Sequence, residues 1–205
     1  MSSQGGTMTT HPPFARLGAA CGIIFSVALF IASGQNLKAV GLAAIVLFLP
    51  FLAYLTTVLS QAEGEHGWLA RCAFAAGLAG IILKLSSVIP EVVIHYDHVA
   101  NGTPLHNTLQ GIADATTVVC LYPLGIMLAA VCAVSLTTRA LPRWLGYFAG
   151  INAAALIVNG SFLNASNVPA LLLFVIWTFT AGIVLFLRAH KVAAAITNPQ
   201  PAAAV

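Results

Sequence analysis

The stretch Lys84–Thr117, KLSSVIPEVVIHYDHVANGTPLHNTLQGIADATT, combines two apolar segments, a short polar turn and most of the ionisable side chains that lie within apolar sequence. In both segments the polar residues recur at steps of three and four, so a helix carries each set on one face. A short turn makes the two helices antiparallel neighbours, and polar groups avoid lipid, so the two polar faces are predicted to face each other. The sets are Lys84, Ser87, Glu91, His95 and His98, and then Asn107, Gln110, Asp114 and Thr117.

The composition is that of an integral membrane protein. Hydrophobic residues make up 60% of the 205 residues and charged residues only 6%, with a mean hydropathy of +0.96, whereas soluble domains carry roughly 25% charged residues. The net charge of +3 comes from scattered basic residues, so no basic run indicates a nucleic acid partner. Membrane lipids are the expected surroundings, and a homo-oligomer stays open as an alternative.

Six apolar segments of about the length that a bilayer requires predict an all-α, six-helix transmembrane bundle over residues 14–191. Disordered tails are predicted at 1–13 and 192–205, because these ends are rich in small residues and proline and lack apolar periodicity. The predicted helices cover about 14–33, 40–60, 68 to the turn at 101–107, that turn to 135, 144–162 and 169–187.

Local signals refine these helices. Pro90 has no N–H and its ring presses on the carbonyl of Ser86, which predicts a kink or break. Asn107 with Gln110 resembles a capping box that opens the fourth helix, and Glu63 is expected to be solvated in a connection. Small residues share one face of the third helix and predict close helix packing: Ala73, Ala76, Gly77 and Gly80.

Basic residues in the connections set the expected orientation. Lys38 falls on one side of the membrane and all the other connecting basic residues fall on the opposite side, so both termini are predicted to be cytoplasmic. The Lys84–Thr117 stretch then lies at the outer end of the bundle, where Lys84 and Asp114 stand at matched depth and are predicted to pair. The residues of the basic side are Arg16, Arg71, Arg139, Arg143, Arg188 and Lys191.

The second half of the chain carries a family resemblance. The turn Leu141–Gly146, LPRWLG, follows the segment Tyr122–Met127, YPLGIM, and precedes an apolar helix that contains Leu173–Trp177, LFVIW. With these motifs the chain resembles a broad group of uncharacterised bacterial multi-pass membrane proteins. The resemblance implies a helical bundle in the bacterial inner, or plasma, membrane, and it implies no activity, cofactor or catalytic residue.

The polar stripes leave three functions open. In the first, the protein binds or transports a lipid or small amphipathic molecule in an outer-leaflet polar pocket between the third, fourth and fifth predicted helices, because buried polar residues in membranes face a cavity or each other. The expected pocket residues are Lys84, Ser87, Glu91, His95, His98, Gln110, Asp114 and Asn159.

The second function is a membrane-embedded enzyme that acts on a lipophilic substrate. Glu91 or Asp114 would be the acid or base and His95 the relay, or Glu91, His95 and His98 would bind a metal with Asp114 or His106 as a further ligand. The third is a structural role, in which an internal ion pair holds the helices together without a ligand. The sequence names no cofactor for any of the three.

Overall fold

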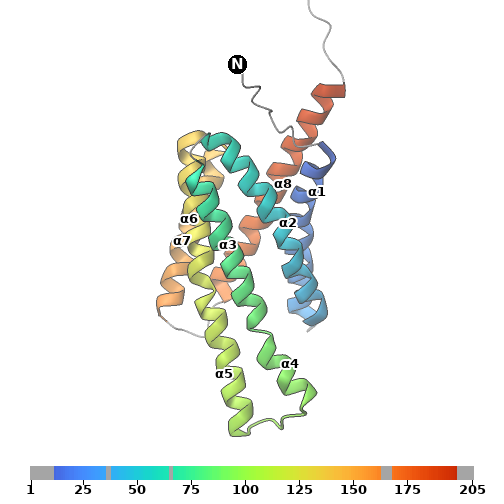
Figure 1. Cartoon of the computed structure of the whole chain (residues 1–205), viewed down its shortest axis with the longest axis vertical. Helices are drawn as coiled ribbons and strands as arrows, with labels where there is room; N and C mark the ends of the chain where they lie inside the picture. Colours follow the sequence, from blue (N-terminus) through green and yellow to red (C-terminus); the bar gives the residue numbers. More distant parts are fainter. Residues whose placement is uncertain (1–11, 36–37, 65–66, 163–167, 198–205) are drawn as a thin grey trace, which may run out of the picture.

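The computed structural model describes residues 12–35, 38–64, 67–162 and 168–197, and in these ranges the chain forms α-helices and no strand (Figure 1). The helix α3 with α4, and α5 with α6, each form one interrupted helical stretch, so the predicted all-α bundle of six helices is confirmed. The bounds are α1 Pro12–Gln35, α2 Lys38–Glu63, α3 Trp68–Ser86, α4 Ile89–Tyr96, α5 Pro104–Val119, α6 Leu121–Thr138, α7 Arg143–Ser161 and α8 Val168–Thr197.

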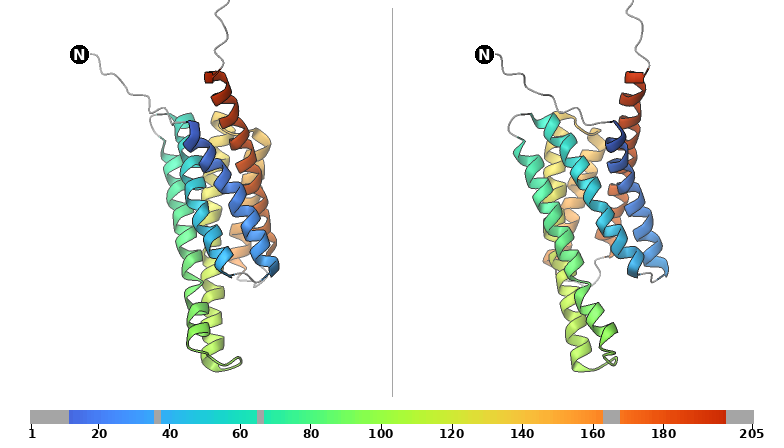
Figure 2. Two further views of the ribbon diagram at one scale, coloured as in Figure 1. Left: turned by 90° about the vertical axis from the view of Figure 1, so that its right-hand side faces the viewer. Right: turned by 45° about the vertical axis from the view of Figure 1, so that its right-hand side comes forward.

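The helices pack in two neighbouring groups. The helix α1 packs against α2 and α8, whereas α6 packs against α3 and α7, and contacts of α2 with α3 and of α7 with α8 join the groups (Figure 2). Aromatic rings fill the centre of the first group, where the Phe48 ring lies 5.0 Å from the Phe25 ring and 5.7 Å from the Phe174 ring, measured between centroids. These contacts join α1, α2 and α8 at one level.

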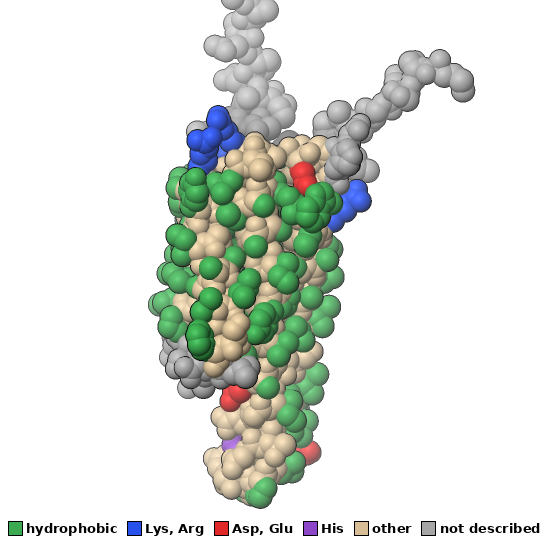
Figure 3. Space-filling view, turned by 90° about the vertical axis from the view of Figure 1, so that its left-hand side faces the viewer, with side chains coloured by type: hydrophobic (Ala, Val, Ile, Leu, Met, Phe, Trp, Pro, Cys, Tyr) green, Lys and Arg blue, Asp and Glu red, His purple; other side chains and the backbone are tan. Residues whose placement is uncertain are grey.

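Length and surface both fit a multi-pass membrane protein. Four helical stretches in the described ranges are long and apolar enough to cross a bilayer, and the apolar part of α1, Arg16–Ala32, is shorter. Large apolar side chains cover the outside of the bundle, and Phe30 and Ile151 are 71% and 67% exposed (Figure 3). A surface of this kind suits lipid, because soluble proteins rarely expose large apolar patches. The four stretches are Val40–Glu63, Trp68–Tyr96, Pro104–Thr138 and Pro169–Ala189.

The two ends of the bundle differ in charge. The helix α1 begins and α8 ends at the same end of the bundle (Figure 1), where Lys and Arg side chains gather (Figure 3). Arg188 of α8 donates a hydrogen bond there to the carbonyl of Ala140, in the turn between α6 and α7. The described arginines therefore gather at one end as expected, and the assignment of that end to the cytoplasm stays a prediction.

Prolines explain the two interruptions. The helix α3 ends at Ser86, and α4 begins at Ile89 with Pro90 in its first turn, so the predicted break is confirmed. Between α5 and α6 the interruption falls at Cys120, and Pro123 lies in the first turn of α6. Since proline has no N–H, it leaves the carbonyl four residues earlier without its helical partner.

Two local predictions are wrong at helix ends. The fourth predicted helix begins at Pro104, where the Thr103 hydroxyl accepts from the His106 N–H at 3.2 Å, so Asn107 lies inside α5 and does not cap it. Glu63 is half-buried, and its carboxylate accepts from the backbone N–H groups of Leu69 and Ala70 at 3.1 and 3.0 Å. It therefore caps α3, whose first N–H groups lack helical partners.

The last helix is longer than the sequence pattern predicted. The helix α8 continues to Thr197, although the sequence predicted disorder from residue 192. Alanine has the highest helix propensity of all residues, so the segment that follows Lys191 extends the helix although it has no apolar stripe. Of the predicted N-terminal tail, Pro12 and Pro13 are helical and residues 1–11 lie outside the described ranges, as do residues 198–205.

The small-residue face of α3 packs closely, as predicted. Gly77 and Gly80 are buried, and a Cβ on Gly77 would lie 2.8 Å from both Leu52 Cδ1 and Met127 Sδ. Leu52 and Met127 are themselves fully buried, so neither side chain has free space to move into. The close approach of α3 to α2 and α6 thus depends on the missing side chain.

We expect Gly77→Leu to lower the free energy of unfolding by about 1–3 kcal/mol, because the added side chain overpacks the core. Gly111→Leu is the matched control, since Gly111 is also helical but exposed, with nothing within 4 Å of an added Cβ. That change should stabilise the protein by roughly 0.5–1 kcal/mol through helix propensity. Unfolding titrations with a denaturing detergent in mixed micelles measure both. Equal effects of the two changes would contradict the close packing at α3.

Candidate functional site

The helices α4 and α5 form a hairpin that projects beyond the other helices (Figures 1 and 2). The stretch Pro104–Thr138 contains 35 residues, which is about 52 Å at 1.5 Å per residue. A bilayer core of roughly 30 Å accommodates little more than half of that length. The outer part of the hairpin therefore extends beyond the end of the bundle (Figures 1 and 2).

The first stripe does not continue to His98. The helix α4 ends at Tyr96, and His98 has a φ of 47°, in the left-handed region. The Val99 N–H donates to the Ile94 carbonyl at 3.1 Å, which is the backbone pattern of a Schellman C-cap with His98 at the position that glycine usually takes. His98 thus lies in the turn, and its predicted place on the same helical face as Glu91 and His95 is wrong.

The hairpin residues do not form a common pocket. His95, Gln110 and Asp114 are exposed and Glu91 is half-buried. Ser87 is buried, and its hydroxyl donates to the Lys84 carbonyl of its own helix at 2.7 Å. Asn159 is half-buried and belongs to α7. Of the predicted binding residues, only Lys84 lines either of the two hollows described below.

The residues considered for catalysis or metal binding are exposed or half-buried. Within the described ranges, no group of three or more His, Cys, Asp and Glu side chains is arranged to hold a metal ion, so Glu91, His95 and His98 do not converge with Asp114 or His106 on one point. Asp114 and His95 face outward on separate helices of the hairpin. A proton relay through Glu91, His95 and Asp114 stays a prediction.

Lys84 is bound differently from the prediction. Its ammonium donates to the Thr117 hydroxyl of α5 at 3.1 Å, and Asp114, one turn away on the same helix, is exposed. In the part of the chain that the structure describes, no ion pair joins Lys84 to Asp114. Because water can solvate an exposed carboxylate beyond the end of the bundle, Asp114 does not need the ammonium as a partner.

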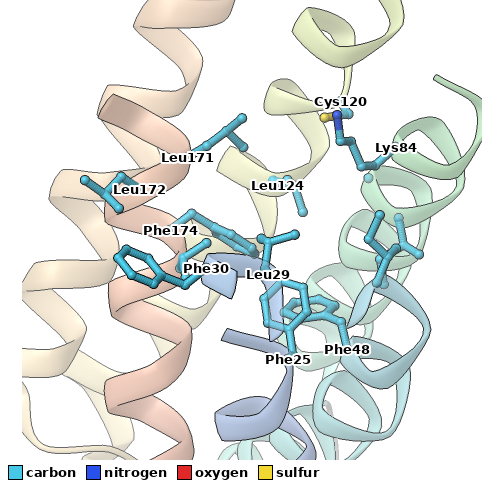
Figure 4. Close-up of a pocket in the computed structure, with 14 residues that line it drawn as sticks. Phe25, Leu29, Phe30, Phe48, Lys84, Cys120, Leu124, Leu171, Leu172 and Phe174 are labelled. Carbon is cyan, nitrogen blue, oxygen red and sulfur yellow. The ribbon is translucent and has the colours of Figure 1, made fainter. Parts of the chain in front are cut away.

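A cavity of about 690 Å³ lies where α1, α2, α3, α6 and α8 meet. Its wall is apolar and aromatic apart from Lys84 and the buried thiol of Cys120. Lys84 and Cys120 lie together at one end, and Phe25 and Phe48 lie at the other (Figure 4). Of the eight predicted pocket residues, Lys84 alone lies on this wall. The cavity therefore lies on a different side of α3 from the predicted pocket.

A second hollow, of about 310 Å³, adjoins the cavity along the seam between α1 and α8. Phe30, Leu172 and Val175 line both hollows, and Phe30 and Leu172 are 71% and 46% exposed on the lipid-facing surface. The two hollows thus meet at side chains that a lipid would touch.

Comparison of the chain with protein-family models, with curated proteins and with solved structures gives no match. The resemblance through the LPRWLG turn therefore stays a prediction. The structure gives this turn a local role, because the fully buried Trp177 of α8 donates its indole N–H to the Leu145 carbonyl at 3.2 Å. Together with the bond from Arg188 to Ala140, this contact ties α8 to the start of α7.

The projecting hairpin can be tested by labelling in cells. In a variant whose four native cysteines are replaced by alanine, we expect His98→Cys to react with a membrane-impermeant maleimide, since His98 is exposed beyond the bundle. Ile151→Cys should stay unlabelled, because its surroundings are hydrocarbon and a thiolate does not form there. The readout is the mass shift of the protein after labelling of intact cells.

The same experiment tests the orientation. Gln61→Cys, exposed at the end of α2, should react only after the membrane is permeabilised if the basic end of the bundle is cytoplasmic. Labelling of Gln61→Cys in intact cells, with His98→Cys protected, would reverse the predicted topology. Protection of both would contradict a hairpin that projects from the membrane.

Proposed function

We propose that this chain is an integral membrane protein that binds the hydrocarbon part of a lipid or small amphiphile in the cavity between α1, α2, α3, α6 and α8. The observation that carries the proposal is a hollow of about 690 Å³ with a nearly uniform apolar wall inside a membrane bundle. Its volume falls within the range of roughly 300–1,000 Å³ that is typical of small-molecule sites.

The free energy of an empty apolar hollow favours a filled cavity. An apolar hollow that is left empty forfeits the dispersion contacts of its wall, so filling it with apolar atoms is favourable. Water is a poor filling, because a buried water needs two to four polar partners and the wall offers few besides Lys84 and Cys120. A hydrocarbon chain fills the cavity, contacts its apolar wall and needs no polar partner.

Access from the lipid phase supports the same function. The second hollow, along the seam between α1 and α8, shares the lining residues Phe30, Leu172 and Val175 with the cavity. A chain can move into the cavity sideways and need not leave hydrocarbon on the way. We include the plasma membrane, and cytoplasmic termini, in the proposal, since the arginines gather at the end where α1 begins and α8 ends.

We expect Leu171→Trp to remove bound amphiphile, because Leu171 lies on the cavity wall of α8 (Figure 4) and an indole occupies part of the volume that the chain needs. Native mass spectrometry of protein purified in a mild detergent should find a chain-bearing molecule on the wild type. The occupied fraction should fall at least about tenfold in the variant, which corresponds to a loss of about 1.4 kcal/mol.

Ile151→Trp is the matched control, since Ile151 is exposed to lipid on α7 and does not line the cavity. It should retain the wild-type occupancy. Equal loss in both variants would indicate general surface lipid, and wild-type protein that carries no chain-bearing molecule in several mild detergents would overturn the proposed function.

A further inference from the structure

We infer that the cavity selects an amphiphile with an anionic headgroup, a carboxylate or a phosphate, which binds the Lys84 ammonium beside the Thr117 hydroxyl while the chain extends toward Phe25 and Phe48. This inference rests on the proposed function and names the class of ligand. It concerns an end of the cavity whose chemistry differs from the rest of the wall.

Charge is confined to that end. Of the described residues on the wall, Lys84 alone is charged. An ammonium carries three N–H donors, and the bond to Thr117 uses one of them. Lys84 is half-buried, so water reaches it only in part and an oxyanion on the cavity side would gain a charge-assisted hydrogen bond. The Thr117 hydroxyl holds the ammonium at this end of the cavity.

The depth of Lys84 suits a lipid in its ordinary position. Lys84 lies about 24 Å along α3 from Trp68 at 1.5 Å per residue, and Trp68 is exposed at the first turn, as expected of a tryptophan at a membrane interface. In a hydrocarbon core of roughly 30 Å, the ammonium therefore lies near the headgroups of the opposite leaflet. A lipid of that leaflet could enter through the α1–α8 seam with its headgroup at the level of Lys84.

The chain itself gives little selectivity. A hydrocarbon chain that leaves the bilayer for an apolar cavity exchanges one apolar environment for another, so the hydrophobic effect contributes little to the difference. The headgroup, by contrast, exchanges water for a partly desolvated ammonium. Differences in affinity among amphiphiles that share one chain should thus depend on the headgroup, and an anionic one is favoured by the charge of Lys84.

The test compares hexadecanoate, hexadecyl phosphate and hexadecanol, which share one chain length. Each displaces an uncharged fluorescent alkyl probe from the purified full-length protein in nanodiscs of phosphatidylcholine. We expect the wild type to bind at least one of the two anions about tenfold or more tightly than hexadecanol. The stronger of the two anions shows whether a carboxylate or a phosphate is the preferred headgroup.

Variants assign the preference to Lys84. The readout is the dissociation constant of hexadecanol divided by that of the preferred anion. In Lys84→Met this ratio should fall to about one, whereas in Lys84→Arg it should stay well above one. Arg71→Met is the matched control, because Arg71 is an exposed cation at the other end of α3, and it should keep the wild-type ratio. Binding of hexadecanol reports whether each variant is folded.

The outcomes separate the two proposals. If the wild type binds all three amphiphiles equally, or if Lys84→Met keeps the preference for the anion, the headgroup inference is wrong and the proposed function stands. If neither the wild type nor Leu171→Trp binds any of the three amphiphiles, the proposed function itself is wrong. If Lys84→Met does not fold, the wild-type ratio and Lys84→Arg decide the question. A ratio of about one in the wild type is sufficient to overturn the headgroup inference.

Discussion

The structure depends on one constraint, which is that hydrocarbon solvates neither backbone polar groups nor charges. Several buried hydroxyls accordingly donate to carbonyls of their own helices, as Ser26 does to Gly22, Thr56 to Leu52 and Thr178 to Phe174, each at 2.9 Å. Among the described residues, the buried Ser135 hydroxyl and the buried Asn152 amide have no hydrogen-bond partner. Arg71, Arg139 and Arg143 lie at or near helix ends, Arg188 of α8 donates to the Ala140 carbonyl, and the carboxylate of Glu63 caps α3. Against this background, Lys84 is the exception, because it is a cation on the wall of an apolar cavity.

Composition and hydrophobic length predicted the helical bundle because both follow directly from this constraint. Pro90 and the small-residue face of α3 were predictable for local reasons, the missing N–H and the missing side chain. The position of the hairpin was not predictable. Polar residues at steps of three and four mark one face of a helix, and such a face looks the same in sequence whether it meets a partner helix or water.

The cavity could not be predicted from local pattern. Its wall joins Phe25, Phe48 and Phe174 from three helices that are far apart in sequence, and each is an ordinary apolar residue within an apolar run. The signal that was available is Lys84, because a charge within a membrane segment is costly and marks function more often than not. Lys84 lies on the cavity wall, whereas Asp114, the partner that periodicity suggested, is exposed and does not pair with it.

The exchange of partner changes what Lys84 can do. Had Asp114 paired with it, the ammonium would be neutralised, and a pair of this kind has little attraction left for a third ion. A hydroxyl partner leaves the net charge in place while it fixes the position of the ammonium. Because Asp114 is exposed and does not pair with it, Lys84 remains a positive charge at one end of an apolar cavity. The ligand proposed above, an amphiphile with a long apolar chain and an anionic headgroup, complements that surface.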